Sequence, residues 1–134
     1  MPTDDASPSG GEWLRFSHTD LRAATLLVDD EGMATVVCFH AQQAAEKALK
    51  GYLAWLGAAD IPKTHDLGRL ADLIVREGGQ TPPEAALEEL ADYGVSARYP
   101  GSRPLAVSEA RDACGAARRV VGFVSAAIGL QPDA

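Results

Sequence analysis

The sequence predicts an all-α protein made of one domain, and two observations support that prediction. Apolar residues recur at steps of three and four along the chain and never alternate over a long stretch, a period typical of amphipathic helices rather than strands. The 134 residues, 46% of them apolar, suffice for one globular domain. We expect this domain to span residues 12–129, between a disordered N-terminal tail of residues 1–11 and a C-terminal tail of residues 130–134.

The first helix is expected from about Glu12 to Val28. Leu14 and Leu21 fall on one stripe with Val28, which faces the core. The helix is expected to stop before Asp29, because three consecutive acidic residues begin there and negative charge at a helix C-terminus opposes the helix dipole.

The second helix is expected from Ala34 to Leu56, before Gly57, a residue that commonly terminates helices. Its stripe follows alternating steps of three and four and contains Cys38, Ala41, Ala45, Ala48, Tyr52 and Trp55. Because several of these side chains are small, we expect another helix to approach this face closely.

The next two helices are shorter and begin at capping signals. One is expected from near Asp66 to Gly78, and the other from a capping box formed by Thr81 and Glu84. Their expected inward-facing residues are Leu67, Leu70, Ile74, Leu87, Leu90 and Gly94.

The fifth helix, near Val107 to Ile128, has the most regular apolar stripe of the chain. Its members are Val107, Ala110, Cys114, Ala117, Val121, Val124 and Ile128, at alternating steps of three and four. A stripe this narrow is typical of packing between near-antiparallel helices. The narrow stripes of this helix and of the second one also motivate the prediction of a homodimer.

The net charge of -7 conceals an uneven distribution of charge along the chain. Residues 1–31 and residues 66–97 each hold two arginines against seven acidic residues, whereas residues 32–65 and 98–134 have a small basic surplus. The overall acidity disfavours binding of duplex DNA or anionic membranes through bulk charge. No stretch is long and apolar enough to span a membrane, and the acidic first residues differ from a signal peptide, so we expect a cytoplasmic protein.

Polar residues on the second helix and in the loop before the fifth are the candidate site. His40, Gln43, Lys47 and Lys50 share one helical face, and Arg98, Tyr99 and Arg103 lie in that loop. The alternative interpretation is a solvated face in which Glu46 pairs with Lys50, four residues later. If the second and fifth helices are neighbours, these residues form a positive strip.

Other patterns indicate structure more than chemistry. The pair of His65 and Asp66 suits proton transfer, but capping of the third helix by Thr64 or Asp66, with His65 fixing the loop, is the favoured interpretation. Cys38 and Cys114 lie among apolar residues and are expected in the core of a protein from a reducing compartment. The three histidines lack ligand spacing and the usual phosphate-binding or dinucleotide-binding motifs are absent, so we expect neither a metal nor a cofactor.

Three strings in the chain resemble the HEPN domain family. They are FHAQQAAEKALK at residues 39–50, KTHDL at residues 63–67 and ARYP at residues 97–100, and the resemblance extends over roughly residues 12–128. It implies an up-and-down antiparallel bundle of four main helices plus a short helix, often dimeric. It also implies a neighbour-encoded minimal nucleotidyltransferase as partner, in a toxin–antitoxin or nucleotide-handling pair.

Many members of that family are metal-independent ribonucleases, which use an arginine followed four to six residues later by a histidine. In this chain no histidine follows Arg98, and no other arginine has a histidine at that distance. The main hypothesis is therefore a partner protein that binds nucleotide or RNA phosphate, through Arg98, Lys47, Lys50 and stacking on Tyr99. The alternatives are an endoribonuclease toxin, in which His40 or His65 works with Arg98, and a protein-interaction scaffold.

Overall fold

The computed structural model describes residues 7–93, 100–101 and 103–129, and every regular element within these ranges is helical. The helices are α1 (Gly10–Leu27), α2 (Ala34–Trp55), α3 (Leu67–Arg76), α4 (Glu84–Leu90) and α5 (Val107–Ile128), with 3-10 turns at Glu31–Met33 and Ala91–Tyr93. The predicted all-α bundle is confirmed. Residues 1–6 and 130–134 of the expected tails lie outside the described residues.

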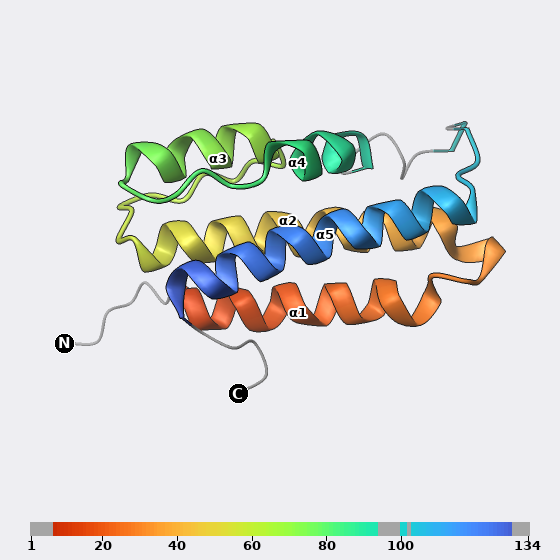
Figure 1. Ribbon diagram of the computed structural model, residues 1–134, viewed down its shortest axis with the longest axis horizontal. Helices are drawn as coiled ribbons and strands as arrows, with labels where there is room; N and C mark the ends of the chain where they lie inside the picture. The colour runs from red at the N-terminus through yellow and green to blue at the C-terminus, as the bar shows by residue number, and fades with distance from the viewer. Residues whose placement is uncertain (1–6, 94–99, 102, 130–134) are drawn as a thin grey trace.

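The helices form a bundle in which the chain reverses direction between α1 and α2 (Figure 1). In this view α1 lies along the bottom, α3 and α4 lie along the top, and α2 and α5 occupy the middle. The link of residues 57–66 runs back along α2, where the side-chain amide of Gln42 donates to the carbonyl of His65 at 3.3 Å. As a result α3 runs in the same direction as α2, and α4 brings the chain back to the start of α5.

Capping side chains determine where two helices begin. The hydroxyl of Ser9 accepts from the backbone N–H of Glu12 at 3.1 Å, and the Glu12 carboxylate accepts from the Ser9 N–H at 2.9 Å. This capping box starts α1 at Gly10, two residues before the expected position. The carboxylate of Asp66 accepts from the N–H of Arg69 at 3.1 Å, so α3 begins after Asp66, as predicted.

The prediction that Thr81 caps α4 is wrong. The residue before the helix is Pro83, which has an extended backbone (φ -67°, ψ 107°), and no side chain caps this end among the described residues. The reason is the pair of prolines, because the residue before a proline is driven away from helical dihedral angles. Pro82 therefore cannot open the helix, and α4 begins at Glu84.

The alanine-rich face of α2 forms the centre of the core. Its buried alanines, each with none of its surface exposed, are Ala41, Ala44, Ala45 and Ala48. Near its end, a Cβ added to Gly51 would lie 2.9 Å from the Cβ of Trp13, so only glycine lets α1 approach this closely. The expected stripe is buried except at Trp55, which is 51% exposed although its Cβ packs near Gly10.

The stripe of α5 packs inside the same molecule, against α2. Six of its seven predicted members are buried, and Val107 is partly exposed. The main partner, α2, runs in the same direction as α5 in Figure 1, and Tyr52 meets Phe123 late in both helices, with ring centroids 6.0 Å apart. The expected antiparallel partners of α5 are α1 and α4, which also contact it. Since both stripes are covered within one chain, they no longer support a homodimer, which stays a prediction.

Candidate functional site

The polar side chains of α2 divide between two buried carboxylates that sequence reasoning did not single out as site residues. We name these groups the Asp20 cluster (Asp20, His40 and Lys47) and the Glu46 cluster (Glu46, Lys50, His65, Gln42 and Gln43). The first joins α2 to α1, and the second joins α2 to the link before α3. Because alanines occupy the opposite face of α2, the polar residues can be turned toward these neighbours.

The Asp20 cluster holds two basic side chains on one carboxylate. His40 Nδ1 donates to Asp20 Oδ1 at 2.8 Å, and Lys47 Nζ donates to Asp20 Oδ2 at 2.6 Å. His40 and Lys47 are seven residues apart, two helical turns, so they share a face of α2. Their side chains stay 30% and 29% exposed, whereas that of Asp20 is 12% exposed. The cluster is therefore an oriented imidazole beside an ammonium group, both within reach of a ligand.

Asp20 reaches this position because it belongs to the buried stripe of α1. That stripe contains Gly10, Leu14, Ser17, Asp20 and Ala24. One turn before Asp20, the hydroxyl of Ser17 donates to the carbonyl of Ala44 at 2.7 Å, a buried hydrogen bond that ties α1 to α2. The sequence signal for Asp20 was an acidic residue three positions after Ser17 on an inward-facing stripe.

The Glu46 cluster fastens the link of residues 57–66 to α2. Glu46 is 4% exposed, and its carboxylate accepts from Lys50 Nζ at 3.0 Å and from His65 Nδ1 at 2.8 Å. The amides of Gln42 and Gln43 also donate to Glu46 Oε1, at 3.5 and 3.4 Å. The predicted pairing of Glu46 with Lys50 is present, but the expectation that it lies on a solvated face is wrong, because Lys50 is only 8% exposed.

His65 has the structural role that the sequence favoured. The Nδ1 atom of His65 contacts the carboxylate of Glu46, whereas the carboxylate of Asp66 caps α3. The two neighbouring side chains therefore have different partners. The side chain of His65 is 53% exposed, so one edge of the imidazole still faces solvent. The pairing between His65 and Asp66 as a proton-transfer unit has no support in this geometry.

Arg103 belongs to a third group, at the start of α5. Its guanidinium donates to both oxygens of Glu109, at 2.9 and 2.6 Å. These hydrogen bonds, together with one from the backbone N–H of Ala106, lower the pKa of Glu109 to about 2. Among the described residues no hydrogen bond or ion pair joins Arg103 to either cluster of α2. Arg98 and Tyr99 lie outside the described residues.

The structure thus brings together some of the predicted site residues and separates others. His40 and Lys47 meet at Asp20, while Gln43 and Lys50 meet at Glu46. The single positive strip expected between α2 and the end of the chain is not formed by the described residues, because each described basic residue among the predicted set is paired with an acidic residue of this chain.

The described residues favour neither a metal site nor a reactive Cys38 thiol. Within those ranges, no three His, Cys, Asp or Glu side chains gather in a way that suits a metal ion. Burial raises the pKa of the Cys38 thiol to about 12, which keeps it from acting as a nucleophile. In the same part of the chain, none of the helices combines the length and the apolar character that crossing a membrane requires.

Comparisons with known proteins agree on one fold. The family model described as HEPN domain matches residues 11–127. The crystal structure of ST0689, an archaeal HEPN homologue, has a TM-score of 0.70 at 22% sequence identity, over 91% of this chain and 99% of that one. That of TT1696 from Thermus thermophilus has a TM-score of 0.69 at 28% identity, over 87% and 96%. A search of curated proteins finds no match.

Proposed function

Because the chain belongs to the HEPN domain family, we propose that it binds nucleotide or RNA phosphate as the partner of a minimal nucleotidyltransferase, in a toxin–antitoxin-type pair. The phosphate-binding surface in this proposal is the Asp20 cluster. Arg98 and Tyr99, assigned to the same role by resemblance, would add a guanidinium fork and a stacking ring.

The observation that supports this proposal is the pairing of two half-exposed basic groups on one buried carboxylate. Asp20 holds the His40 imidazole and the Lys47 ammonium at 2.8 and 2.6 Å, so both are oriented before a ligand arrives. The ammonium group of Lys47 keeps further N–H donors besides the one that bonds to Asp20, so the cluster can donate to an anion. Preorganised donors lose little conformational freedom on binding and therefore bind more tightly than mobile ones.

The phosphate site is tested by titrating a six-nucleotide single-stranded RNA into the protein by calorimetry. Lys47→Gln and His40→Gln should each weaken binding about tenfold, the effect expected for one hydrogen bond to a charged group. The matched control is Arg76→Gln, which removes one positive charge from the exposed end of α3. Equal affinity in the wild type and both cluster variants would contradict this site.

The partner is tested by coexpression with the nucleotidyltransferase encoded beside this gene. A complex that persists in size-exclusion chromatography supports the pair, and a genome without such a neighbour argues against it. A stable complex combined with no RNA affinity would favour the alternative of a pure protein-interaction scaffold.

One observation favours a second candidate function, a metal-independent endoribonuclease. A carboxylate that holds Nδ1 of an imidazole orients the other ring nitrogen for proton transfer, and Asp20 stands in this relation to His40. RNA cleavage that persists in EDTA and disappears in His40→Ala would support this function. Cleavage equal in wild type and His40→Ala would exclude His40 as the acid or base.

A further inference from the structure

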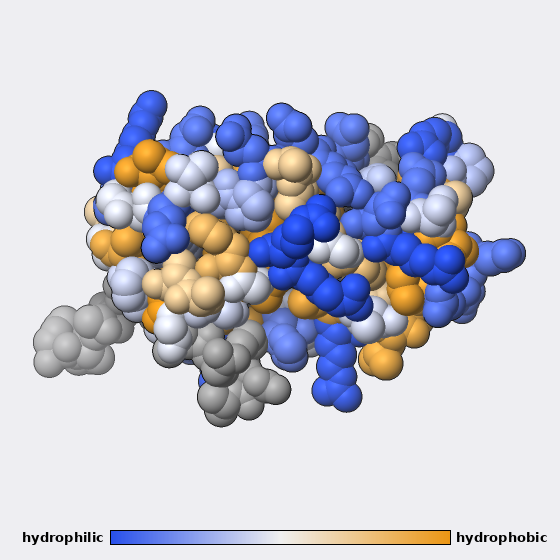
Figure 2. Space-filling model, viewed as in Figure 1, coloured by the Kyte–Doolittle hydropathy of each residue, from blue (hydrophilic) through white to orange (hydrophobic). Residues whose placement is uncertain are grey.

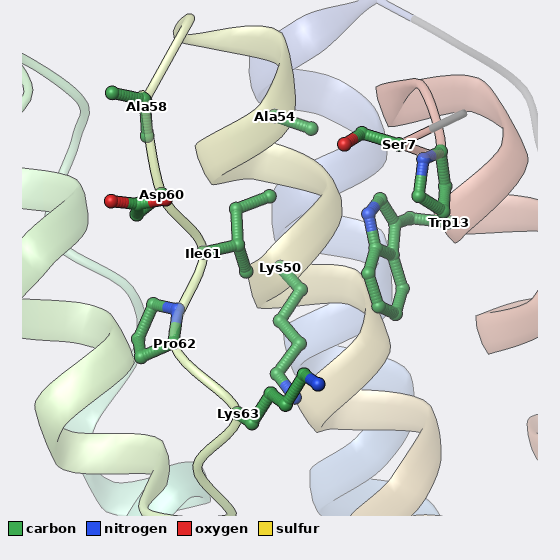
Figure 3. Close-up of a pocket in the computed structure, with 11 residues that line it drawn as sticks. Ser7, Trp13, Lys50, Ala54, Ala58, Asp60, Ile61, Pro62 and Lys63 are labelled. Atoms are coloured by element: carbon green, nitrogen blue, oxygen red, sulfur yellow. The ribbon is translucent and has the colours of Figure 1, made fainter. Parts of the chain in front are cut away.

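A pocket lies beside the end of α2, away from the Asp20 cluster. Its volume is about 440 Å³, and its walls come from three parts of the chain: the start of α1, the last turns of α2 and the link before α3. Figure 3 shows Trp13 on one side, Ile61 and Pro62 on the other, and Lys50 and Lys63 at one end. Nothing in the proposed function uses this space.

The polar end of the pocket carries two ammonium groups. Lys50 is 8% exposed, and its Nζ bonds to Glu46 and lies 5.9 Å from the centroid of the Trp13 ring. Lys63 is exposed on the link and also lines the pocket, and Figure 3 shows it at the same end as Lys50. Glu46 neutralises one charge, and Lys63 has no ion pair among the described residues. This end of the pocket therefore favours an anionic group.

Asp60 also lines the pocket, but Figure 3 shows its carboxylate turned away from the end that Lys50 and Lys63 line. An anion between the two lysines therefore avoids contact with this like charge. The acidic side chain at the rim does not cancel the local preference.

The apolar part of the pocket is built for a flat group. The indole ring of Trp13 faces Ile61 and Pro62 across the space, with Ala54 on the wall formed by α2. The indole N–H of Trp13 is buried and has no hydrogen-bond partner in the described part of the chain. Because this nitrogen is inaccessible to solvent, it offers no donor to the pocket, and Trp13 contributes the surface of its ring.

We infer that this pocket binds a small organic anion with a planar aromatic body. Its carboxylate or phosphate binds at the end of the pocket lined by Lys50 and Lys63, and its ring packs against the indole ring of Trp13. This site is separate from the Asp20 cluster, because neither His40 nor Lys47 is among the residues that line the pocket. A ligand bound in this pocket would bridge α1 and the link of residues 57–66.

The test follows the indole N–H signals of the full-length protein by NMR while small aromatic anions are added. The probes are 2-naphthoate and 2-naphthyl phosphate, with neutral 2-naphthamide and inorganic phosphate as matched compounds lacking the charge or the ring. The Trp13 signal should shift with both aromatic anions, and whichever of the two binds more tightly identifies the anionic group. The Trp55 signal, assigned by its loss in Trp55→Phe, should stay in place, because Trp55 is not among the pocket residues.

Substitutions separate this site from the phosphate site of the proposed function. Lys63→Gln removes an exposed side chain and should weaken 2-naphthoate about tenfold, as expected for a hydrogen bond to a charged group. Lys47→Gln removes the same charge from the Asp20 cluster and should leave 2-naphthoate binding unchanged while weakening RNA. No shift of the Trp13 signal at millimolar 2-naphthoate, equal binding of 2-naphthamide, or equal weakening by both substitutions would overturn the inference.

Discussion

The Asp20 and Glu46 clusters have the same chemical parts and different environments. Each joins one carboxylate to one histidine and one lysine, with hydrogen bonds between 2.6 and 3.0 Å. The lysine side chain is 29% exposed beside Asp20 and 10% exposed beside Glu46. A carboxylate with histidine and lysine partners can therefore orient basic groups at the surface or fasten a link to a helix, and the lysine is the more buried in the second case.

The largest effect is expected from removing the buried carboxylate, in Glu46→Leu. This change leaves Lys50 buried without its partner and should lower the free energy of unfolding by about 3 kcal/mol, the cost of breaking a buried ion pair. Urea denaturation measures the loss. The double variant Glu46→Leu with Lys50→Met is the control and should recover most of the stability, because no buried charge remains unpaired. A single-variant loss below about 1 kcal/mol, typical of a surface pair, would place this cluster on the surface.

A smaller effect is expected at the other carboxylate, in Asp20→Asn. The amide keeps the shape of the side chain but loses one charged acceptor, and we expect a loss of about 1 to 2 kcal/mol in the free energy of unfolding. The loss is smaller because His40 and Lys47 can turn to water when they are released. The same urea series measures it, and a cost equal to that of Glu46→Leu would show that the two clusters do not differ in role.

The smallest effect is expected at Glu109, an acidic residue paired with Arg103 at the surface. The hydrogen bonds from Arg103 lower its pKa to about 2 from an ordinary value of 4.5, so folding favours the ionised form. Its contribution to stability is complete above about pH 4.5 and is lost as the pH falls through about 2. The difference in unfolding free energy between wild type and Glu109→Gln should therefore shrink as the pH falls from about 5 to about 2, the range that contains both pKa values.

Arg103→Gln is the matched variant for that pH series. It removes the main cause of the lowered pKa, so the pH dependence assigned to Glu109 should weaken in this variant as well. A difference between wild type and Glu109→Gln that stays constant over the whole range would contradict the pairing.

The large exposed apolar side chains of the described residues are distributed over three helices. Figure 2 shows a face on which hydrophilic residues are spread between scattered apolar ones, with no single large apolar area. The exposed large apolar side chains are Phe16, Leu26, Val36, Trp55 and Val75, which come from α1, α2 and α3. None of these five residues belongs to the Asp20 cluster or the Glu46 cluster.

Helices were predicted well because their signals are local. The bounds of α5 agree with the expectation from Val107 to Ile128, and α2 ends one residue earlier than expected. Two details differ from the prediction. Pro82 and Pro83 delay the start of α4, and Trp55, at the end of the α2 stripe, is 51% exposed.

The candidate site was predicted less completely, because its partners are distant along the chain. His40 and Lys47 were singled out, yet the residue that holds them, Asp20, lies 20 and 27 positions away. Lys50 was expected to be solvated, and its burial depends on the link of residues 57–66 folding back over α2. A helical period reports which face of a helix a residue occupies, and it does not report what covers that face.

By itself, the sequence determined the helical class, the buried stripes of α2 and α5 and the start of α3 near Asp66, since each depends on residues a few positions apart. Only the tertiary structure decided which basic side chains remain accessible. The docking of α1 places Asp20 beside His40 and Lys47, and the returning link buries the pairing of Glu46 with Lys50. The physical reason is that charge pairing and burial depend on distances in space, which close only when helices pack.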